Sequence, residues 1–418
     1  MSDSFTEIKS GRLRGARERG VCVFRNIPYA NVRRFRSPEP GPAWPGVRDA
    51  TRRGPVPPQA PSRLEMVSGP PGDARQSEDC LVVTVTTPAL DGSRPVIAWL
   101  HGGAYVSGGG ELPWYDAHAL AYEGEVVVVS ITYRLGVFGY LWSEDEAARN
   151  LGLADQAAAL AWIQRNIAAF GGDPRRVTLA GQSAGGHAIA ALLASGETLY
   201  RRAILASAPL GLWPKPETAA AFAVQFAEAV GDDPLGAETA KLLAAQGQVI
   251  AARREGLPVA PVIDGSNLTR AGVDILAGWT RDDASPFVRL GLAGPSDGGL
   301  HLETVAPLTE QQFAGPTRAF AALSSAGAGT FLYQMDWRPR GSPFGACHVL
   351  DAALVFGGEA AWRAAPMLGD ARWSEVETLG RQMRGAWAAF AHTGDPSSEV
   401  GGAWAPWRPG DEVRRLDL

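Results

Sequence analysis

The feature that most constrains this chain is a G-x-S-x-G motif at residues 181–185, with Ser183 at its centre. A short β-branched and apolar run, residues 177–180, precedes the motif, and a good helix former, residues 186–193, follows it. The serine therefore falls at a strand-to-helix turn, which is the context that a nucleophile elbow needs. The N–H groups at the start of the following helix face the place where negative charge would develop. A Gly-Ser turn without function is the alternative, and this placement argues against it.

Apolar runs alternate with helical periodicity along the chain. The runs suit strands that are buried on both faces of a sheet. Residues 5–30 are typical of an N-terminal β-meander, and helical spacing covers 153–170, 216–256 and 373–392. Strands that alternate with helices predict an α/β fold with a central, mostly parallel twisted sheet flanked by helices. The predicted strands are 81–86, 96–100, 126–131, 177–180, 203–206, 273–278 and 330–335.

Composition and charge exclude several classes of protein. A net charge of −5 provides no basic surface for nucleic acid. The longest strongly apolar run, residues 126–131, is too short to span a bilayer. No set of His, Cys and Asp at ligand spacing predicts a metal site, and no motif predicts a cofactor.

The cysteines and the start of the chain bear on its compartment. The three cysteines cannot all pair, and their scarcity favours a reducing cytoplasm. The start of the chain lacks the basic and then apolar order of a secretory signal, so a cytoplasmic location is expected. A secreted mature form whose signal has been removed is the alternative. We find no repeat and no linker, so residues 1–418 are expected to form a single domain. No pattern distinguishes a monomer from a homo-oligomer.

Three candidate catalytic side chains follow predicted strands. In a sheet of this kind, ligands bind beyond the carboxyl ends of the strands. Ser183 follows the strand at 177–180, the pair Asp282 and Asp283 follows the strand at 273–278, and His348 lies after the strand at 330–335. The order serine, acid, histidine is similar to that of α/β-hydrolases.

Separate motifs along the chain occur in an order that identifies a family. They are 26–30 (NIPYA), 77–81 (SEDCL), 101–105 (HGGAY), 133–136 (YRLG), 150–156, 170–186, 345–348 (GACH) and 390–396 (FAHTGDP). Over nearly its whole length the chain thus resembles the type-B carboxylesterase and cholinesterase family of α/β-hydrolases, particularly bacterial para-nitrobenzyl-esterase-like members. The resemblance implies a serine carboxylester hydrolase that cleaves small-molecule esters through an acyl-enzyme. The alternatives are an amidase or transacylase with the same triad, or a non-catalytic binding protein on the same fold.

The resemblance also implies roles for individual residues. Ser183 is the expected nucleophile, His348 its general base and Asp283 the acid that orients the histidine. Asp282 remains open as the acid, because the family usually has Glu at position 283 and both neighbours here are aspartates. The expected oxyanion donors are the N–H groups of Gly103, Ala104 and Ala184. We expect structural roles for the other histidines: His101, His118, His187, His301 and His392.

The chain departs from the family pattern at several positions. Ala104 stands where the family usually has a third glycine, and Gln182 replaces the cholinesterase glutamate, which argues against a choline-specific site. Residues 55–58 lack the usual partner of Cys80, so no disulfide is expected. The helical cap and gorge region, roughly 210–330, is shorter than in most members. Two matching family ion pairs should brace the fold: Arg34 with Glu78, and Arg134 with Asp155.

Overall fold

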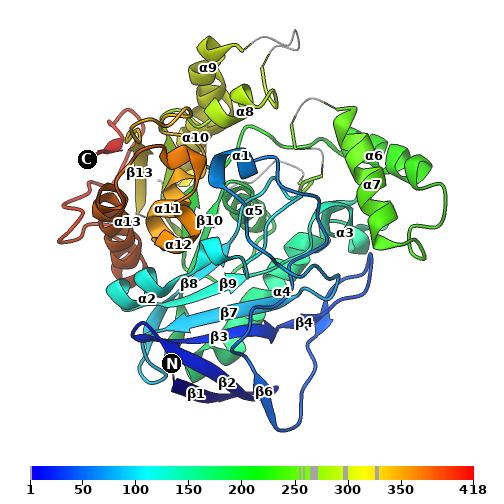
Figure 1. Ribbon diagram of the computed structural model, residues 1–418, viewed down its shortest axis with the longest axis horizontal. Coiled ribbons are helices and arrows are strands. Elements are labelled where there is room, and N and C mark those ends of the chain that lie inside the picture. Colours follow the sequence, from blue (N-terminus) through cyan, green and yellow to red (C-terminus); the bar gives the residue numbers. More distant parts are fainter. Residues whose placement is uncertain (1, 254–255, 258, 264–271, 295–299, 325–328) are drawn as a thin grey trace.

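The computed structural model describes residues 2–253, 256–257, 259–263, 272–294, 300–324 and 329–418. A large mixed sheet runs through the molecule (Figure 1). In their spatial order its strands are β1 (Ser2–Ile8), β2 (Gly11–Glu18), β3 (Val21–Pro28), β7 (Val82–Thr87), β9 (Val127–Ile131), β8 (Arg94–Leu100), β10 (Gly172–Gln182), β11 (Arg202–Ala206), β12 (Asp274–Thr280), β13 (Thr330–Met335) and β14 (Arg414–Leu416). Neighbours from β9 to β14 are parallel, whereas β1, β2, β3, β7 and β9 pair antiparallel. The predicted α/β fold with an N-terminal meander is confirmed.

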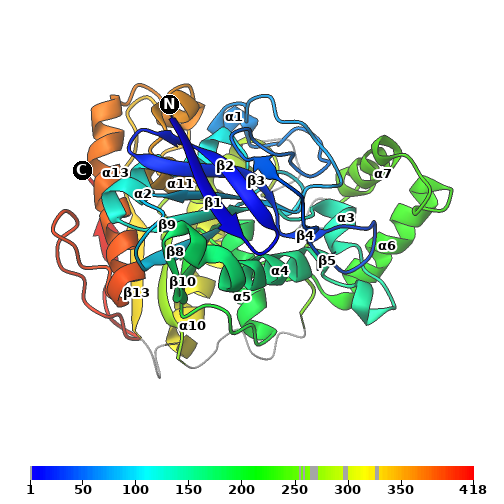
Figure 2. The same ribbon diagram turned by 90° about the horizontal axis from the view of Figure 1, so that it is seen from below.

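Two apolar cores lie on opposite faces of this sheet, because successive side chains of a strand point to opposite faces. In β8, Val96 and Ala98 belong to one core, and Ile97 and Trp99 belong to the other. The first face is covered by α4 (Leu151–Asn166) and α5 (Ala184–Ala194). The second face is covered by α2 (His118–Gly124), α11 (Leu350–Phe356) and α13 (Trp373–Thr393) (Figure 2). The near-continuous apolar runs of the sequence follow from this burial on both faces.

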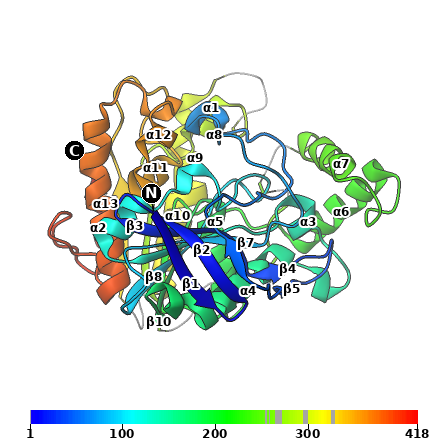
Figure 3. The same cartoon turned by 60° about the horizontal axis from the view of Figure 1, so that its bottom comes forward.

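The predicted helical stretch at 216–256 forms two helices, α6 (Pro216–Val230) and α7 (Thr239–Ala251). Gly231 ends α6 with φ 68°, in the left-handed conformation that favours glycine after a helix. The two helices lie side by side at one edge of the molecule (Figures 1 and 3). Residues 254–255 of the prediction lie outside the described residues. Shorter elements are α1 (Glu65–Ser68), α3 (Gly136–Tyr140), α8 (Ser285–Arg289), α9 (Val305–Thr309), α10 (Gly315–Ser324), α12 (Glu359–Trp362), β4 (Ala30–Asn31), β5 (Glu39–Pro40) and β6 (Val47–Asp49).

The predicted Arg34–Glu78 pair fastens α6 and α7 to the body. Arg34 Nε donates to Glu78 Oε2 at 2.9 Å, and Arg34 Nη1 donates to the carbonyl of Ala237 at 2.6 Å. The Thr239 hydroxyl donates to the same carboxylate at 2.6 Å. One ion pair thus holds both the connection between the two helices and the start of α7.

The loop before Cys80 closes without a disulfide. The N–H of Val56 donates to the carbonyl of Arg75 at 2.9 Å, and the N–H of Ser77 donates to the carbonyl of Val56 at 3.0 Å. Cys80 is buried and free, as are the other two cysteines of the chain. Backbone hydrogen bonds therefore hold the base of this loop, as the missing disulfide partner requires.

The second predicted ion pair is buried. Arg134 Nε donates to Asp155 Oδ2 at 2.8 Å and Nη2 donates to Oδ1 at 2.6 Å, while the two side chains are only 3% and 0% exposed. Arg134 Nη1 also donates to the carbonyl of Arg36 at 2.7 Å. The pair therefore connects α4 with two loops in a region from which water is excluded.

Replacing Arg134 with methionine is expected to lower the free energy of unfolding by about 3–5 kcal/mol, because Asp155 is left as a buried charge without its partner. Urea denaturation followed by tryptophan fluorescence measures the change. Arg363→Met is the matched control, since the side chains of Arg363 and Glu359 are 71% and 43% exposed in their pair and the change should alter stability by less than about 1 kcal/mol. Equal losses in both variants would contradict the prediction.

Candidate active site

Ser183 lies in a strained turn between β10 and α5. Its φ of 55° and ψ of −123° are values that a residue with a side chain rarely adopts. Gly185 makes the turn possible, because a Cβ atom there would lie 2.0 Å from the carbonyl oxygen of Leu100. The N–H of Ser183 donates to the carbonyl of Ala206 at 2.9 Å, which anchors the turn to β11. The strained serine thus stands at the carboxyl end of the sheet.

Three side chains from separate loops form a continuous hydrogen-bonded chain. His348 Nε2 lies 2.7 Å from Ser183 Oγ, and His348 Nδ1 lies 2.5 Å from Asp283 Oδ1. Asp283 Oδ2 accepts the N–H of Thr280 at 3.0 Å, which orients the carboxylate. His348 and Asp283 are fully buried, whereas Ser183 is 8% exposed. This arrangement allows His348 to take the serine proton while Asp283 fixes the tautomer of the imidazole.

Asp282 lies outside the hydrogen-bonded chain of Ser183, His348 and Asp283. Its carboxylate accepts from Arg338 Nε at 2.8 Å and Nη2 at 2.7 Å, and from the N–H of Ala346 at 3.0 Å. Its own N–H donates to the carbonyl of Ala346 at 2.8 Å. Asp282 therefore ties the end of β12 to the loop that carries His348, and Asp283 is the residue that meets the imidazole.

Aromatic rings surround the imidazole of His348. The ring centroids of Phe287 and Phe313 lie 5.0 Å and 5.3 Å from that of His348. Such contacts keep water from the hydrogen bond between His348 and Asp283, where a low local dielectric strengthens it.

The expected oxyanion donors come from two segments. The loop after β8 contributes Gly103 (φ 119°) and Ala104 (φ 52°), and α5 begins at Ala184. Among the described residues, no acceptor binds the N–H of Gly103 or Ala104, and the first N–H of a helix has no partner inside it. Only glycine fits at position 103, because a Cβ atom would lie 2.0 Å from the carbonyl oxygen of Ser107. Ala104 keeps its N–H and adopts a left-handed conformation.

A second carboxyl group, that of Asp351, lies near His348 and was not among the predicted site residues. Asp351 is buried one turn after His348, and the Ser207 hydroxyl donates to its Oδ2 at 3.4 Å. Burial, followed by the negative charge of Asp283, raises the pKa of Asp351 to about 7. An acidic residue three positions after a candidate histidine is the signal that could have found it. The raised pKa limits the second negative charge that His348 experiences.

The other histidines pair with groups outside this chain of hydrogen bonds. Burial lowers the pKa of His101 to about 4, and its Nδ1 lies 2.8 Å from the Gly102 carbonyl oxygen. The remaining pairs are His118 with Asp116, His187 with Tyr105, His301 with Glu303, and His392 with the carbonyl of Gly124.

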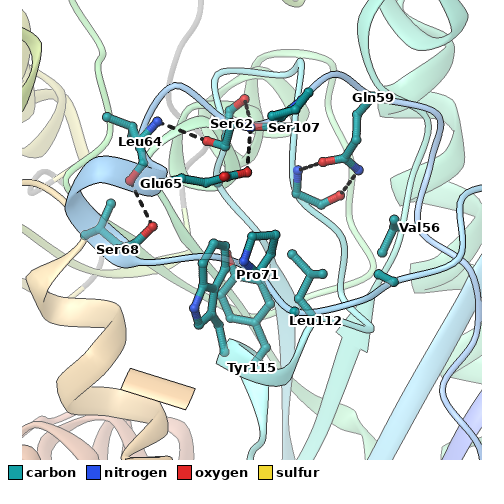
Figure 4. A pocket seen from close by; sticks show the side chains of 18 of the residues that line it. Val56, Gln59, Ser62, Leu64, Glu65, Ser68, Pro71, Ser107, Leu112 and Tyr115 are labelled. Carbon is teal, nitrogen blue, oxygen red and sulfur yellow. Dashed lines mark hydrogen bonds between the residues drawn. The ribbon is translucent and has the colours of Figure 1, made fainter. Parts of the chain in front are cut away.

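A cavity of about 290 Å³ opens beside the three side chains. Ser183 and His348 do not line it, but Gln182 and Val349, the neighbours of each, do, together with Gly102 and Gly103. One wall comes from the loop at 56–76 and another from aromatic residues (Figure 4). The aromatic residues are Trp114, Tyr115 and Trp362.

Gln59 connects the loop at 56–76, one wall of this cavity, to the loop after β8 that contains Gly103 and Ala104. Its Nε2 donates to the carbonyl of Gly108 at 2.7 Å, and its Oε1 accepts the N–H of Gly108 at 2.7 Å (Figure 4). On the opposite side, Gln182 Nε2 lies 3.4 Å from His348 Nε2. The cavity therefore adjoins both the expected oxyanion donors and the nitrogen that faces Ser183.

Two kinds of feature are absent from the described part of the chain. None of its helices combines the length and apolar character needed to cross a bilayer. No three His, Cys, Asp or Glu side chains within the described ranges converge as metal ligands do.

Comparison with known proteins identifies the family of the chain. The sequence model described as "Carboxylesterase family" matches residues 2–297 and 299–415. A probable N-octanoylanthranilate hydrolase of Rhodococcus erythropolis is 40% identical over 98% of this chain and 96% of its own length. The para-nitrobenzyl esterase of Bacillus subtilis is 36% identical over 96% of this chain and 92% of its own. A solved PNB esterase superposes with a TM-score of 0.87 at 34% identity, covering 100% of this chain and 96% of that one.

The orientation of the two aspartates predicts different effects of their removal. Asp283→Asn is expected to lower kcat for p-nitrophenyl acetate at neutral pH by about 10³–10⁴, because asparagine stabilises the wrong tautomer of His348. Asp282→Asn should lower kcat less than tenfold, since it loosens the contact with Arg338 and leaves Asp283 in place. Initial rates of both variants give the comparison. A larger loss in Asp282→Asn would assign the acid to Asp282.

Proposed function

This chain belongs to the carboxylesterase family, and on that premise we propose that it hydrolyses small-molecule carboxylic esters with Ser183, His348 and Asp283 as its catalytic triad. The observation that carries the proposal is the pair of hydrogen bonds, 2.7 Å and 2.5 Å long, on the two nitrogens of His348. A serine hydroxyl is a weak nucleophile, and a base at this distance is what activates it.

The reaction follows from the positions of these atoms. Ser183 Oγ attacks the ester carbonyl carbon while its proton moves to His348 Nε2, and the carbonyl oxygen becomes an oxyanion facing the N–H groups of Gly103, Ala104 and Ala184. The carbonyl re-forms as the bond to the alcohol oxygen breaks, and His348 protonates the departing alcohol. Water then attacks the acyl-enzyme as its proton moves to His348 Nε2, and His348 returns that proton to Ser183 Oγ as the bond to the acyl group breaks and the acid leaves.

We assign the cavity of about 290 Å³ to the leaving alcohol. The departing oxygen must receive its proton from His348 Nε2, so the alcohol lies on the side of Gln182 and Val349. The aromatic side chains of the cavity suit an apolar or aromatic alcohol. Gln182 provides a neutral amide next to the histidine, and the carboxylate in the cavity lining is that of Glu65.

An amidase is the second candidate. The relative from Rhodococcus erythropolis is named as a probable hydrolase of N-octanoylanthranilate, whose octanoyl group is bonded to nitrogen. The same triad can cleave such a bond when His348 protonates a departing amine. Comparing kcat/KM for p-nitrophenyl octanoate and N-octanoylanthranilate decides which class the site prefers.

We further propose that residues 1–418 form one α/β-hydrolase domain with a shortened cap at about 210–330, because each apolar core includes residues from both ends of the chain. Three free and buried cysteines support a reducing, cytoplasmic setting.

Ser183→Ala is expected to keep the fold and to lower kcat for p-nitrophenyl esters by several orders of magnitude, about 10⁶ where the triad acts as a unit. The wild type and the variant are compared on a series of acyl chain lengths, with circular dichroism as the control for folding. Retention of most activity by a folded Ser183→Ala variant would end the serine-esterase proposal.

Val349→Gly is expected to widen the choice of alcohol. Val349 has a φ of 77°, which is unfavourable for a β-branched residue, and it lines the cavity beside His348. Glycine accepts this φ and removes a side chain from the cavity. We expect the ratio of kcat/KM for naphthyl acetate to that for ethyl acetate to rise about tenfold, the scale of one or two methyl groups in an apolar pocket. An unchanged ratio would place the alcohol elsewhere.

A further inference from the structure

The three oxyanion donors need a connection that fixes the distance between them. Gly103 and Ala104 belong to the loop after β8, whereas Ala184 belongs to the first turn of α5. A shift of about 1 Å between two such segments can cost a hundredfold in rate. The described residues contain a direct side-chain link between them, from Tyr105, next to Ala104, to His187, in the first turn of α5.

Tyr105 holds the strained part of the loop. Ala104 and Tyr105 both have positive φ, 52° and 62°, which residues with side chains adopt only when their surroundings impose it. The Tyr105 side chain is 0% exposed, and its ring packs edge-on against Tyr140 with 4.7 Å between centroids. Its carbonyl accepts the N–H of Gly136 at 2.6 Å. These contacts place Tyr105 where it can set the conformation of Ala104.

His187 forms the other side of the link, through a hydrogen bond with the hydroxyl of Tyr105. Tyr105 Oη and His187 Nδ1 lie 2.7 Å apart, and both side chains are completely buried. Trp213 stacks on the imidazole with 3.7 Å between ring centroids, which fixes the plane of the ring. Burial lowers the pKa of His187 to about 3, with the Leu212 backbone acting in the opposite direction. The imidazole is therefore neutral, and one hydrogen bond joins its Nδ1 to the Tyr105 hydroxyl.

The backbone of His187 completes the connection. Its N–H donates to the carbonyl of Ser183 at 2.9 Å, so the residue belongs to the same turn as the serine and Ala184. A single side-chain hydrogen bond thus spans from the turn with the nucleophile to the loop with the other two donors.

We propose that His187 is a positioning residue for ester hydrolysis, which acts through Tyr105 to hold the N–H of Ala104 at a fixed distance from that of Ala184. The inference rests on the proposed function, because it concerns the geometry of that oxyanion hole. His187 itself does not touch the substrate, and its effect should appear in the stabilisation of the transition state rather than in binding of the ester.

Three variants test the link: Tyr105→Phe, His187→Met and the double variant. Each single change is expected to lower kcat for p-nitrophenyl acetate by about ten- to a hundredfold with KM within about threefold of the wild type. Inhibition by an aryl trifluoromethyl ketone gives a second readout. Ser183 Oγ adds to the ketone carbon as its proton moves to His348, and the resulting oxyanion occupies the hole. Its inhibition constant should rise by the same factor as kcat/KM falls.

The double variant separates positioning from stability. It removes both partners of the bond between Tyr105 and His187 together, so its urea midpoint should lie above that of either single variant and closer to that of the wild type. Its kcat should stay as low as in the single variants, because all three lack the same hydrogen bond. Recovery of kcat together with the midpoint would overturn the inference, as would wild-type kcat in Tyr105→Phe.

Tyr29→Phe is the matched control, since it also removes a buried hydroxyl. That hydroxyl donates to the carbonyl of Thr132 at 2.8 Å and makes no contact with the link between Tyr105 and His187. We expect its kcat within about twofold of the wild type. A loss equal to that of Tyr105→Phe would make the effect of Tyr105→Phe non-specific and overturn the inference.

The wild-type assay distinguishes the two proposals. A wild type that hydrolyses no ester refutes the proposed function, whereas an active wild type matched by Tyr105→Phe refutes only the role of His187.

Discussion

The strained turn at Ser183 is the constraint on which the rest of the site depends. A φ of 55° costs on the order of 1–3 kcal/mol for a serine, and it persists only where the surroundings enforce it. Here the first ten residues of α5 are buried, and Gly185 lets the helix approach the end of β8. The same approach brings the N-terminus of α5 beside the loop of Gly103 and Ala104. Strain at one residue thus sets the position of the proposed nucleophile relative to the proposed oxyanion donors.

Each loop that contributes to the site is held by a polar contact of its own. Asp282 and Arg338 hold the loop of His348, the amide of Gln59 holds the cavity wall against Gly108, and Tyr105 bonds to His187. Loops have few apolar contacts to fix them, so buried or bidentate hydrogen bonds provide the rigidity that the sheet provides for its strands. The proposed catalytic geometry therefore depends on contacts that lie outside the triad.

Much of the fold could be predicted because its signals are local. The strand at 330–335 has the predicted bounds, and Gly231 ends α6 in a left-handed conformation. Apolar runs and helix-terminating glycines act over a few residues, so a linear reading captures them. The cavity could not be predicted in this way, since its wall at 56–76 has little periodicity and is closed by backbone hydrogen bonds.

For the site, the residue types, their order and the strand ends that they follow could all be predicted from the sequence. The sequence does not distinguish Asp282 from Asp283, because the direction of each side chain depends on how β12 ends and on which loop packs against that end. The packing of the folded chain brings Asp283, 65 positions from His348, to the Nδ1 of that histidine. It also brings Ser183, 165 positions away, to the Nε2 of the same ring. The tertiary structure also revealed the bond between Tyr105 and His187. Contacts between residues so distant in the chain depend on packing of the whole sheet and its helices, which no local pattern encodes.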